Sequence, residues 1–421
     1  MGIPSRMQRG PLDACGVRHI APADQAGAAL VQELEPELAI LLWRVLRLAQ
    51  SSRIVLHPEH ERAACAALEA GLLCGALPEM VRAPAAVIAG EAASGQPNAE
   101  LVAKACWCLV EWALGVGAAR TAVAFAEAAG LSAEQSGRHA LATGRFMRRN
   151  GLPREGEAWL RRARRLARAS RDWDCLVLST SSLAMHVWEQ GNYPVSKRLL
   201  ERARRTARAH KLRTLEGEVM HNLLVLAIDM KRGKEAQEYA EGTFERYLPD
   251  HPKLPALAYD VAYLWLTQGH AGRALAMFQA LLPHFTDVAP RVQILAAICR
   301  CAGLTGNAEL VMESEAHTRA LTSSYQREMP MLPAALIDIG IALGTVGDMD
   351  RARVALRRAG EIAGKAGNSE CLMRAEQALA DLEFNHGTRD LETGHRRAAQ
   401  PAQDAFATRF VQALADVVPA G

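Results

Sequence analysis

The sequence is poor in aromatic residues and in strand-forming patterns. Phenylalanine, tyrosine and tryptophan make up 5% of its 421 residues, whereas half of all residues are apolar, with alanine and leucine dominant. No run of alternating β-branched and polar residues is bounded by the Asn-Gly or Asp-Gly turns that signal a β-hairpin. Because helices that pack through small side chains have this composition, the sequence predicts an all-α protein.

Sequence motifs for catalysis and nucleotide binding are also absent. The sequence contains neither a phosphate-binding G-x-x-x-x-G-K-[ST] loop nor a G-x-G-x-x-G turn after a strand, and it lacks G-x-S-x-G and H-E-x-x-H. His57, His60 and Cys65 are the best metal-ligand candidates, but they lack a fourth ligand of clear spacing. We therefore expect no metal, no cofactor and no enzymatic activity.

Long apolar runs are missing as well. The first 24 residues have no apolar stretch of signal-peptide length, and no 18-residue apolar run suggests membrane insertion. The nine cysteines, an odd number, lie mostly within apolar helical runs, which indicates buried, reduced thiols. We expect a cytoplasmic protein, and the Ala- and Arg-rich composition suggests a bacterial source.

What the sequence does contain is an internal repeat. Six glycines each follow an amphipathic run of about 15 residues and precede a second run rich in Ala and Leu. Their spacings are 40, 42, 36, 37 and 41 residues. A glycine can end one helix in the left-handed conformation, so that a second helix returns antiparallel to the first. Such hairpins bury their apolar faces by stacking. The six glycines are Gly151, Gly191, Gly233, Gly269, Gly306 and Gly347.

This pattern resembles the tetratricopeptide repeat superfamily. That family has a small residue midway along the first helix of each hairpin (helix A) and an alanine early in the second (helix B). The Gly233 repeat departs from the pattern, with Ala236 and Ala240 out of step. The matching small residues are Gly144, Ala184, Ala262, Cys299 and Gly340 in helix A, and Gly156, Ser196, Ala274 and Ala352 in helix B.

The period near 40 is similar to the subtype in the sensor solenoids of bacterial regulators such as the maltose activator. The resemblance covers residues 98–385 and implies a right-handed superhelical solenoid of antiparallel helix pairs, with seven to eight repeats. We expect residues 1–29 to be disordered and 30–97 to form a helical N-terminal extension or degenerate repeat that caps the solenoid, with a separate effector domain as the alternative. A polar linker, 386–402, precedes an amphipathic helix, 403–418, with Phe406, Phe410 and Leu414 on one face.

In that family helix A lines the concave surface. The residues that this register places there mix Arg, Trp, Tyr and Met, which protein-binding surfaces favour, although each aromatic side chain could equally fill the core. The groove candidates are Arg145, Arg148, Met185, Trp188, Asn222, Tyr259, Tyr263 and Arg300.

A basic block stands out against a net charge of +3. Residues 141–213 carry 18 Lys and Arg against 6 Asp and Glu, a local excess of +12. A solvated helix face, a surface for an acidic protein and a nucleic-acid site all remain possible, but the lack of interleaved aromatic residues disfavours nucleic acid. The predicted basic convex face comprises Arg161, Arg162, Arg165 and Arg168 with Arg198, Arg202 and Arg205.

These features favour a non-catalytic repeat scaffold or adaptor that binds a protein or peptide through its concave groove and its basic convex face, and the convex face would suit an acidic partner. The alternative is a ligand- or peptide-sensing bacterial regulator whose solenoid controls an effector or a DNA-binding partner. The sequence leaves the partner's identity and the oligomeric state open.

Overall fold

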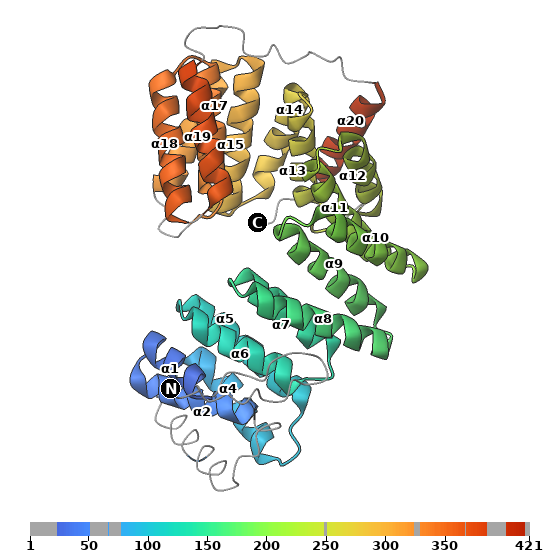
Figure 1. Ribbon diagram of the computed structural model, residues 1–421, viewed down its shortest axis with the longest axis vertical. Helices are drawn as coiled ribbons and strands as arrows, with labels where there is room; N and C mark the ends of the chain where they lie inside the picture. The colour runs from blue at the N-terminus through green and yellow to red at the C-terminus, as the bar shows by residue number, and fades with distance from the viewer. Residues whose placement is uncertain are drawn as a thin grey trace, which may run out of the picture. The chain divides into compact units, whose positions relative to one another are not determined.

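The computed structural model describes residues 23–50, 66, 77–247, 251–323, 329–366, 368–384 and 401–416. Within these ranges the chain forms α-helices and one short 3-10 helix, and no residue forms a strand (Figure 1). The predicted all-α class is confirmed for these residues.

Consecutive helices pair into antiparallel hairpins along most of the chain. Helix A of one hairpin also packs against helix A of the next, as in α7 with α9 and α15 with α17. The hairpins are α5 (Ala99–Gly115) with α6 (Ala119–Ser132), α7 (Gly137–Arg149) with α8 (Pro153–Ser170), α9 (Trp173–Glu189) with α10 (Tyr193–Ala209), α11 (Arg213–Asp229) with α12 (Gly233–Tyr247), α13 (Leu254–Thr267) with α14 (Ala271–Leu281), α15 (Val288–Thr305) with α16 (Ala308–Ser323), and α17 (Leu332–Thr345) with α18 (Met349–Lys365).

Local sequence signals explain where many of these helices begin. Asn98 caps α5 by accepting hydrogen bonds from the backbone N–H groups of Glu100 and Leu101, at 3.1 and 3.3 Å. Asp172 caps α9 in the same way, and Pro153 occupies the first turn of α8. These side chains satisfy backbone donors that a helix leaves unpaired, or remove the need for one.

The two helices of a hairpin approach closely at a pair of positions twelve residues apart. A Cβ built on Gly156 would lie 3.0 Å from the carbonyl oxygen of Gly144, and 2.9 Å from the backbone nitrogen of Arg148. In the next hairpin the Ser196 hydroxyl donates to the carbonyl oxygen of Ala184 at 2.9 Å. The predicted small positions are therefore the points of contact between helix A and helix B.

The turn of the α11–α12 hairpin corrects one sequence assignment. The left-handed residue is Lys231, with φ of 56°, whereas Gly233 is already the first residue of α12. Counted from Lys231, Ala236 stands five residues on, as Ala274 does from Gly269, and it is fully buried. This repeat therefore has the same spacing between turn and contact residue as the others. The sequence pattern had been counted from Gly233, which is not the turn residue.

A further hairpin precedes the six that the glycine spacing predicts. Gly117, with φ of 80°, turns α5 into α6, and Ala122 follows it by five residues at the buried contact position. The spacing from Gly117 to Gly151 is shorter than the other intervals, which explains why the near-40 period missed it.

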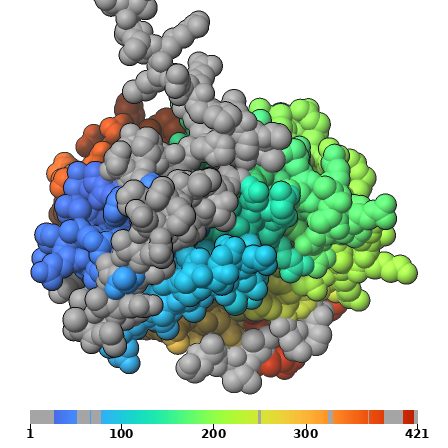
Figure 2. Space-filling model, turned by 90° about the horizontal axis from the view of Figure 1, so that it is seen from below, coloured from blue at the N-terminus to red at the C-terminus, as the bar shows by residue number. Residues whose placement is uncertain are grey.

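The chain divides into two compact units, Met1–Val219 and Met220–Gly421, and the division falls within α11. In the first unit, α1 (Ala23–Glu33), α2 (Pro36–Ala49) and α4 (Glu79–Ala93) pack with α5 and α6 around one core. The Glu33 carboxylate accepts from the backbone N–H groups of Arg120 and Thr121, both at 2.9 Å. Figure 2 shows α2 and α4 on the surface of this unit.

These helices bear on the predicted N-terminal boundaries. Helix α1 begins at Ala23, seven residues before the expected start of helical structure at 30. Residues 1–22, most of 51–76 and 385–400 lie outside the described residues. The last range includes most of the linker expected at 386–402, whose final two residues already belong to a helix that begins at Pro401.

In the second unit, α19 (Ser369–Phe384) follows α18 as a further helix A, and α20 (Pro401–Asp416) packs against α13 and α14 (Figure 1). Phe406, Phe410 and Leu414 are each at most 6% exposed. The ring centroids of Phe410 and Phe244, on α12, are 4.5 Å apart. The amphipathic C-terminal helix therefore completes the core next to α12 and α14.

Helix α15 is, among the described helices, long and apolar enough to cross a membrane by length and composition. More than half of it, 56%, is buried inside the protein, and it carries Arg291 and Arg300. It packs as a core helix of the second unit, between α14 and α17.

The contact at Gly156 makes a prediction about stability. We expect Gly156→Ala to lower the free energy of unfolding by about 1–3 kcal/mol, because the added methyl group meets backbone atoms that cannot move away. The matched control is Gly90→Ala in α4, where nothing lies within 4 Å of the added Cβ. There the same change should stabilise by about 0.5–1 kcal/mol. Thermal unfolding followed by circular dichroism measures both; equal effects would refute the close approach.

Candidate functional site

All eight groove candidates lie on helix A of a hairpin, and each is half-buried. The boundary inside α11 separates them into two sets, which we call the helix-A faces of the first and second units. The face of the first unit contains Arg145 and Arg148 on α7 and Met185 and Trp188 on α9; that of the second contains Asn222 on α11, Tyr259 and Tyr263 on α13, and Arg300 on α15.

On the first face, the two arginines of α7 reach across to α9. The Nε of Arg145 donates to the Ser182 hydroxyl at 2.8 Å, and Arg148 forms an ion pair with Glu189. Burial lowers the pKa of Arg145, and the charge of Glu218 opposes that shift. Because polar groups of a neighbouring helix hold these guanidinium groups, they are oriented before any partner arrives.

On the second face, the structure adds two residues that sequence reasoning missed, Asp338 on α17 and Arg374 on α19. Burial raises the pKa of the Asp338 carboxyl to about 6, while the charges of Arg300 and Arg374 act to lower it. Three successive A helices, α15, α17 and α19, thus bring two guanidinium groups near one carboxyl group. Among the described residues, the buried NH1 of Arg300 has no hydrogen-bond partner.

The tyrosines of α13 border this charged group. Burial, then the nearby charge of Asp338, raises the pKa of both Tyr259 and Tyr263. The rings of Tyr259 and Phe278 meet edge to face, with centroids 5.5 Å apart. The second face therefore combines neutral phenols with two cations and one acid.

A signal for Asp338 was present in the sequence. It is a single acid within the apolar run LPAALIDIGIAL, two residues before the small contact residue Gly340. Ser182 stands at the same offset from Ala184, and it contacts Arg145. Positions two before and one after the contact residue share one helix surface, because they are three residues apart. This rule would have found Asp338; Arg374 follows no comparable rule.

The basic face on α8 and α10 requires one correction. Arg162 is 3% exposed rather than on the surface. Its guanidinium lies 5.3 Å from the centroid of the Trp159 ring and donates to the carbonyl oxygen of Glu134 at 2.9 Å, just beyond the end of α6. The Arg162 side chain therefore points toward the preceding hairpin, where its positive charge and N–H groups satisfy a carbonyl group next to the C-terminal end of α6.

The other six arginines are exposed. The half-buried Arg164 shows that the two helices share one surface: burial lowers its pKa, and so does the charge of Arg202 on α10, followed by Arg168 and Arg161 on α8. Glu157 pairs with Arg161 at 2.6 Å. We call the six exposed arginines of α8 and α10 the outer arginine surface. They are Arg161, Arg165, Arg168, Arg198, Arg202 and Arg205.

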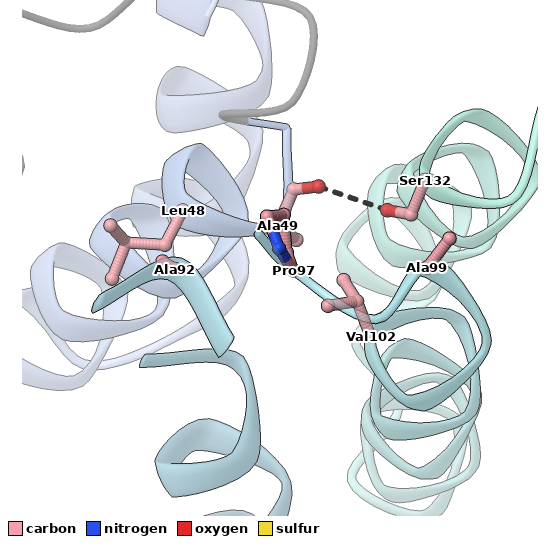
Figure 3. Close-up of a pocket in the computed structure, with 7 residues that line it drawn as sticks. All are labelled: Leu48, Ala49, Ala92, Pro97, Ala99, Val102 and Ser132. Carbon is pink, nitrogen blue, oxygen red and sulfur yellow. Dashed lines mark hydrogen bonds between the residues drawn. The ribbon is translucent and has the colours of Figure 1, made fainter. Parts of the chain in front are cut away.

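Cavities and clusters of metal-ligating side chains among the described residues are weaker candidates for a functional site. A hollow of about 20 Å³, lined by Leu48, Ala92, Val102 and their neighbours, has room for roughly one water molecule (Figure 3). Ser132 lies at its edge, donating to the carbonyl oxygen of Ala49 at 2.9 Å. The described residues contain no group of three or more metal-ligating side chains. His57, His60 and Cys65 lie outside the described residues.

The raised pKa of Asp338 makes a second prediction. Its folded-state pKa, about 6, exceeds the ordinary value of 3.8, so the folded protein binds more protons between these values and stability falls as pH rises through them. Asp338→Asn should therefore raise the free energy of unfolding by roughly 2–3 kcal/mol near pH 7.5. Near pH 4 it should have little effect.

Thermal unfolding at both pH values tests this, with Asp350→Asn as the control. The Asp350 side chain is 98% exposed, and its replacement should change little at either pH. A destabilised Asp338→Asn variant near pH 7.5 would show that the arginines, not burial, dominate.

No family model matches the sequence, and no curated protein matches it. Among solved structures, the chain is similar to PilF of Pseudomonas aeruginosa, at 17% identity and a TM-score of 0.39, over 53% of this chain and 93% of that one. It is similar to the apo form of RapI at 12% identity and a TM-score of 0.46, over 68% and 97%. It is also similar to a Rap protein complexed with competence and sporulation factor, at 9% identity and a TM-score of 0.41, over 86% and 99%. Likenesses this distant assign neither a family nor a function to the chain.

Proposed function

We propose that this chain is a non-catalytic repeat scaffold that binds a peptide or a protein segment on its helix-A faces. The observation that supports the proposal most is the alignment of half-buried arginine and aromatic side chains on successive A helices. Tryptophan, tyrosine and arginine side chains are enriched among the few residues that carry most of the binding energy in protein interfaces. On the first face, Ser182 and Glu189 already hold two arginines in place.

The outer arginine surface supports a second contact in the same function. Four of its arginines, Arg161, Arg165, Arg168 and Arg202, act on Arg164, and their mutual repulsion would fall when an acidic partner binds. We propose that an acidic protein segment binds here. A protein that holds one partner on a helix-A face and another on the opposite side of its hairpins acts as an adaptor.

The alternative, a sensor that controls an effector, would use residues 30–97 as the effector domain. The described helices of that region share one core with α5 and α6, and Ser132 bonds to Ala49 across it. This packing favours a cap over a separate effector. A cytoplasmic setting belongs to the proposal, because the described cysteines are free thiols, which reducing compartments preserve.

A selection from a random peptide library, with the full chain as target, tests the helix-A faces. We expect peptides with Kd in the micromolar range, and a loss of about 10-fold or more on Trp188→Ala or Tyr263→Ala, as removal of an aromatic anchor produces. Val354→Ala on the exposed side of α18, where Val354 is 66% exposed, is the matched control. Peptides that bind all variants equally would place the site elsewhere.

Charge reversal tests the outer arginine surface. Replacing Arg161, Arg165, Arg202 and Arg205 with Glu should leave helicity and melting nearly unchanged, because these side chains are exposed. Binding of poly-L-glutamate should be lost, and in the wild type it should weaken with salt. A variant that unfolds would contradict the assigned helix surface, and tighter binding of duplex DNA than of poly-L-glutamate would contradict the acidic-protein assignment.

A further inference from the structure

We propose that the surface of α12, α13 and α14 that α20 covers is a binding site for an amphipathic helix of a partner protein, and that α20 occupies it as a tethered internal ligand. We call it the α20-binding surface. The partner helix that fits presents two aromatic residues and one aliphatic residue at positions i, i+4 and i+8, with a basic residue at i+3. The site uses neither the helix-A faces nor the outer arginine surface, so it adds a contact of different chemistry.

Helix α20 stands outside the repeat. It follows α19 in the sequence but packs against α13 and α14, and five helices, α15 to α19, separate it in the chain from α14. Figure 1 shows it beside α12 and α13. Three residues, 268–270, join α13 to α14, whereas 16 residues, 385–400, join α19 to α20. Helix α20 is therefore attached to this surface as a separate segment and not as the second helix of a hairpin.

The α20-binding surface departs from the repeat at one position of helix B. Thirteen residues after the left-handed turn residue, α12 carries Phe244, counted from Lys231, and the 3-10 helix after α14 (Leu282–His284) begins with Leu282, counted from Gly269. In the other five hairpins this position holds Gly130, Arg164, Arg204, Arg319 and Gly360. A large apolar residue thus replaces arginine or glycine in the two hairpins on which α20 packs. This replacement is what a surface for an apolar helix face requires.

The ring of Phe244 is the centre of the contact. Its centroid lies 4.5 Å from that of Phe410 and 5.5 Å from that of Phe406, and the guanidinium of Arg409 lies 5.6 Å from it. Trp265 on α13 meets Phe406 edge to face, with centroids 6.3 Å apart. Aromatic pairs of this geometry add a directional term to the burial of their area. The surface therefore favours aromatic side chains one helical turn apart.

A charge pair at the edge of the contact orients the bound helix. The Nη2 of Arg409 donates to the Oε1 of Glu245 at 2.7 Å, and the two side chains are 58% and 56% exposed. Such an exposed pair contributes little to affinity, but an acid in place of Arg409 would be repelled. The basic residue at i+3 therefore belongs to the pattern that the surface selects. In α20 that pattern consists of Phe406, Arg409, Phe410 and Leu414.

The tether decides which occupant can replace α20. A short linker holds a segment near its site at an effective concentration of about millimolar order. The α20 of a second copy would make the same contacts without that advantage, so it cannot displace the internal helix at micromolar concentration. A helix of another protein can, if it binds this surface more tightly or if its protein also contacts another part of the chain. The occupant that fits is therefore a partner protein.

Anisotropy of a fluorescein-labelled peptide of residues 401–416, the α20 peptide, measures binding to the full chain. Phe410→Asp in the chain disables the internal helix, and this variant should bind the peptide at least about 10-fold more tightly than the wild type, because the tethered competitor is gone. The matched control is Gln412→Asp on the exposed side of α20, which should bind as weakly as the wild type. The α20 peptide that itself carries Phe410→Asp should not bind.

Two further peptides test the recognised pattern. One keeps Phe406, Arg409, Phe410 and Leu414 and has alanine or glutamine at all other positions; it should bind the Phe410→Asp chain within about 10-fold of the α20 peptide. The other carries Arg409→Glu. Adding Glu245→Arg to the Phe410→Asp chain should weaken the α20 peptide about 3-fold, and the Arg409→Glu peptide should recover that loss. A purely structural role of Glu245 would not produce this rescue.

Several results would overturn the inference. They are equal binding of the α20 peptide by the wild-type and Phe410→Asp chains, no binding at millimolar concentration, no binding of the pattern peptide, and no rescue by the charge exchange. A Phe410→Asp chain that loses more helix by circular dichroism than the 16 residues of α20 would show that α20 is a fixed core helix. A complex between wild-type and Phe410→Asp chains in sedimentation at micromolar concentration would assign the surface to a second copy instead.

Discussion

The close approach of the two helices in each hairpin is the constraint on which the rest of the structure depends. At Gly144 and Gly156 the backbones come so near that an added methyl group would meet carbonyl oxygen and amide nitrogen. Ala184 with Ser196 and Gly340 with Ala352 repeat the contact twelve residues apart. Each contact fixes both the separation and the rotation of its helix pair, so side chains at equal offsets from it emerge on the same helix surface.

This repetition accounts for the candidate sites. On α7 and α9, residues beside the contact positions meet as Arg145 and Ser182, and in the second unit equivalent helices bring Arg300 near Asp338. No single helix could assemble such a group. Burial raises the pKa of Asp338 even though the charges of Arg300 and Arg374 act to lower it.

The sequence allowed prediction of the helices, the hairpins and most of the contact residues, because glycine and alanine recur in it at nearly constant intervals. It misplaced one turn, since Lys231 adopts the left-handed conformation that glycine usually takes, and Gly233 stands two residues away. Arg162 was predicted to face solvent because helical periodicity describes only α8 itself. It gives no information about the end of α6, where the Glu134 carbonyl oxygen accepts a hydrogen bond from Arg162. Arg374 lies 74 positions after Arg300, and only the stacking of three hairpins relates them.

The central claim is that stacked A helices bring the charges of α15, α17 and α19 to one place. The most direct measurement is an NMR titration of the Asp338 carboxyl carbon in the wild type and in the Arg300→Gln variant. The account predicts an apparent pKa of about 6 in the wild type, because burial outweighs the arginines, and a higher value in the variant. A wild-type pKa near the ordinary 3.8, or one that ignores the loss of Arg300, would contradict it.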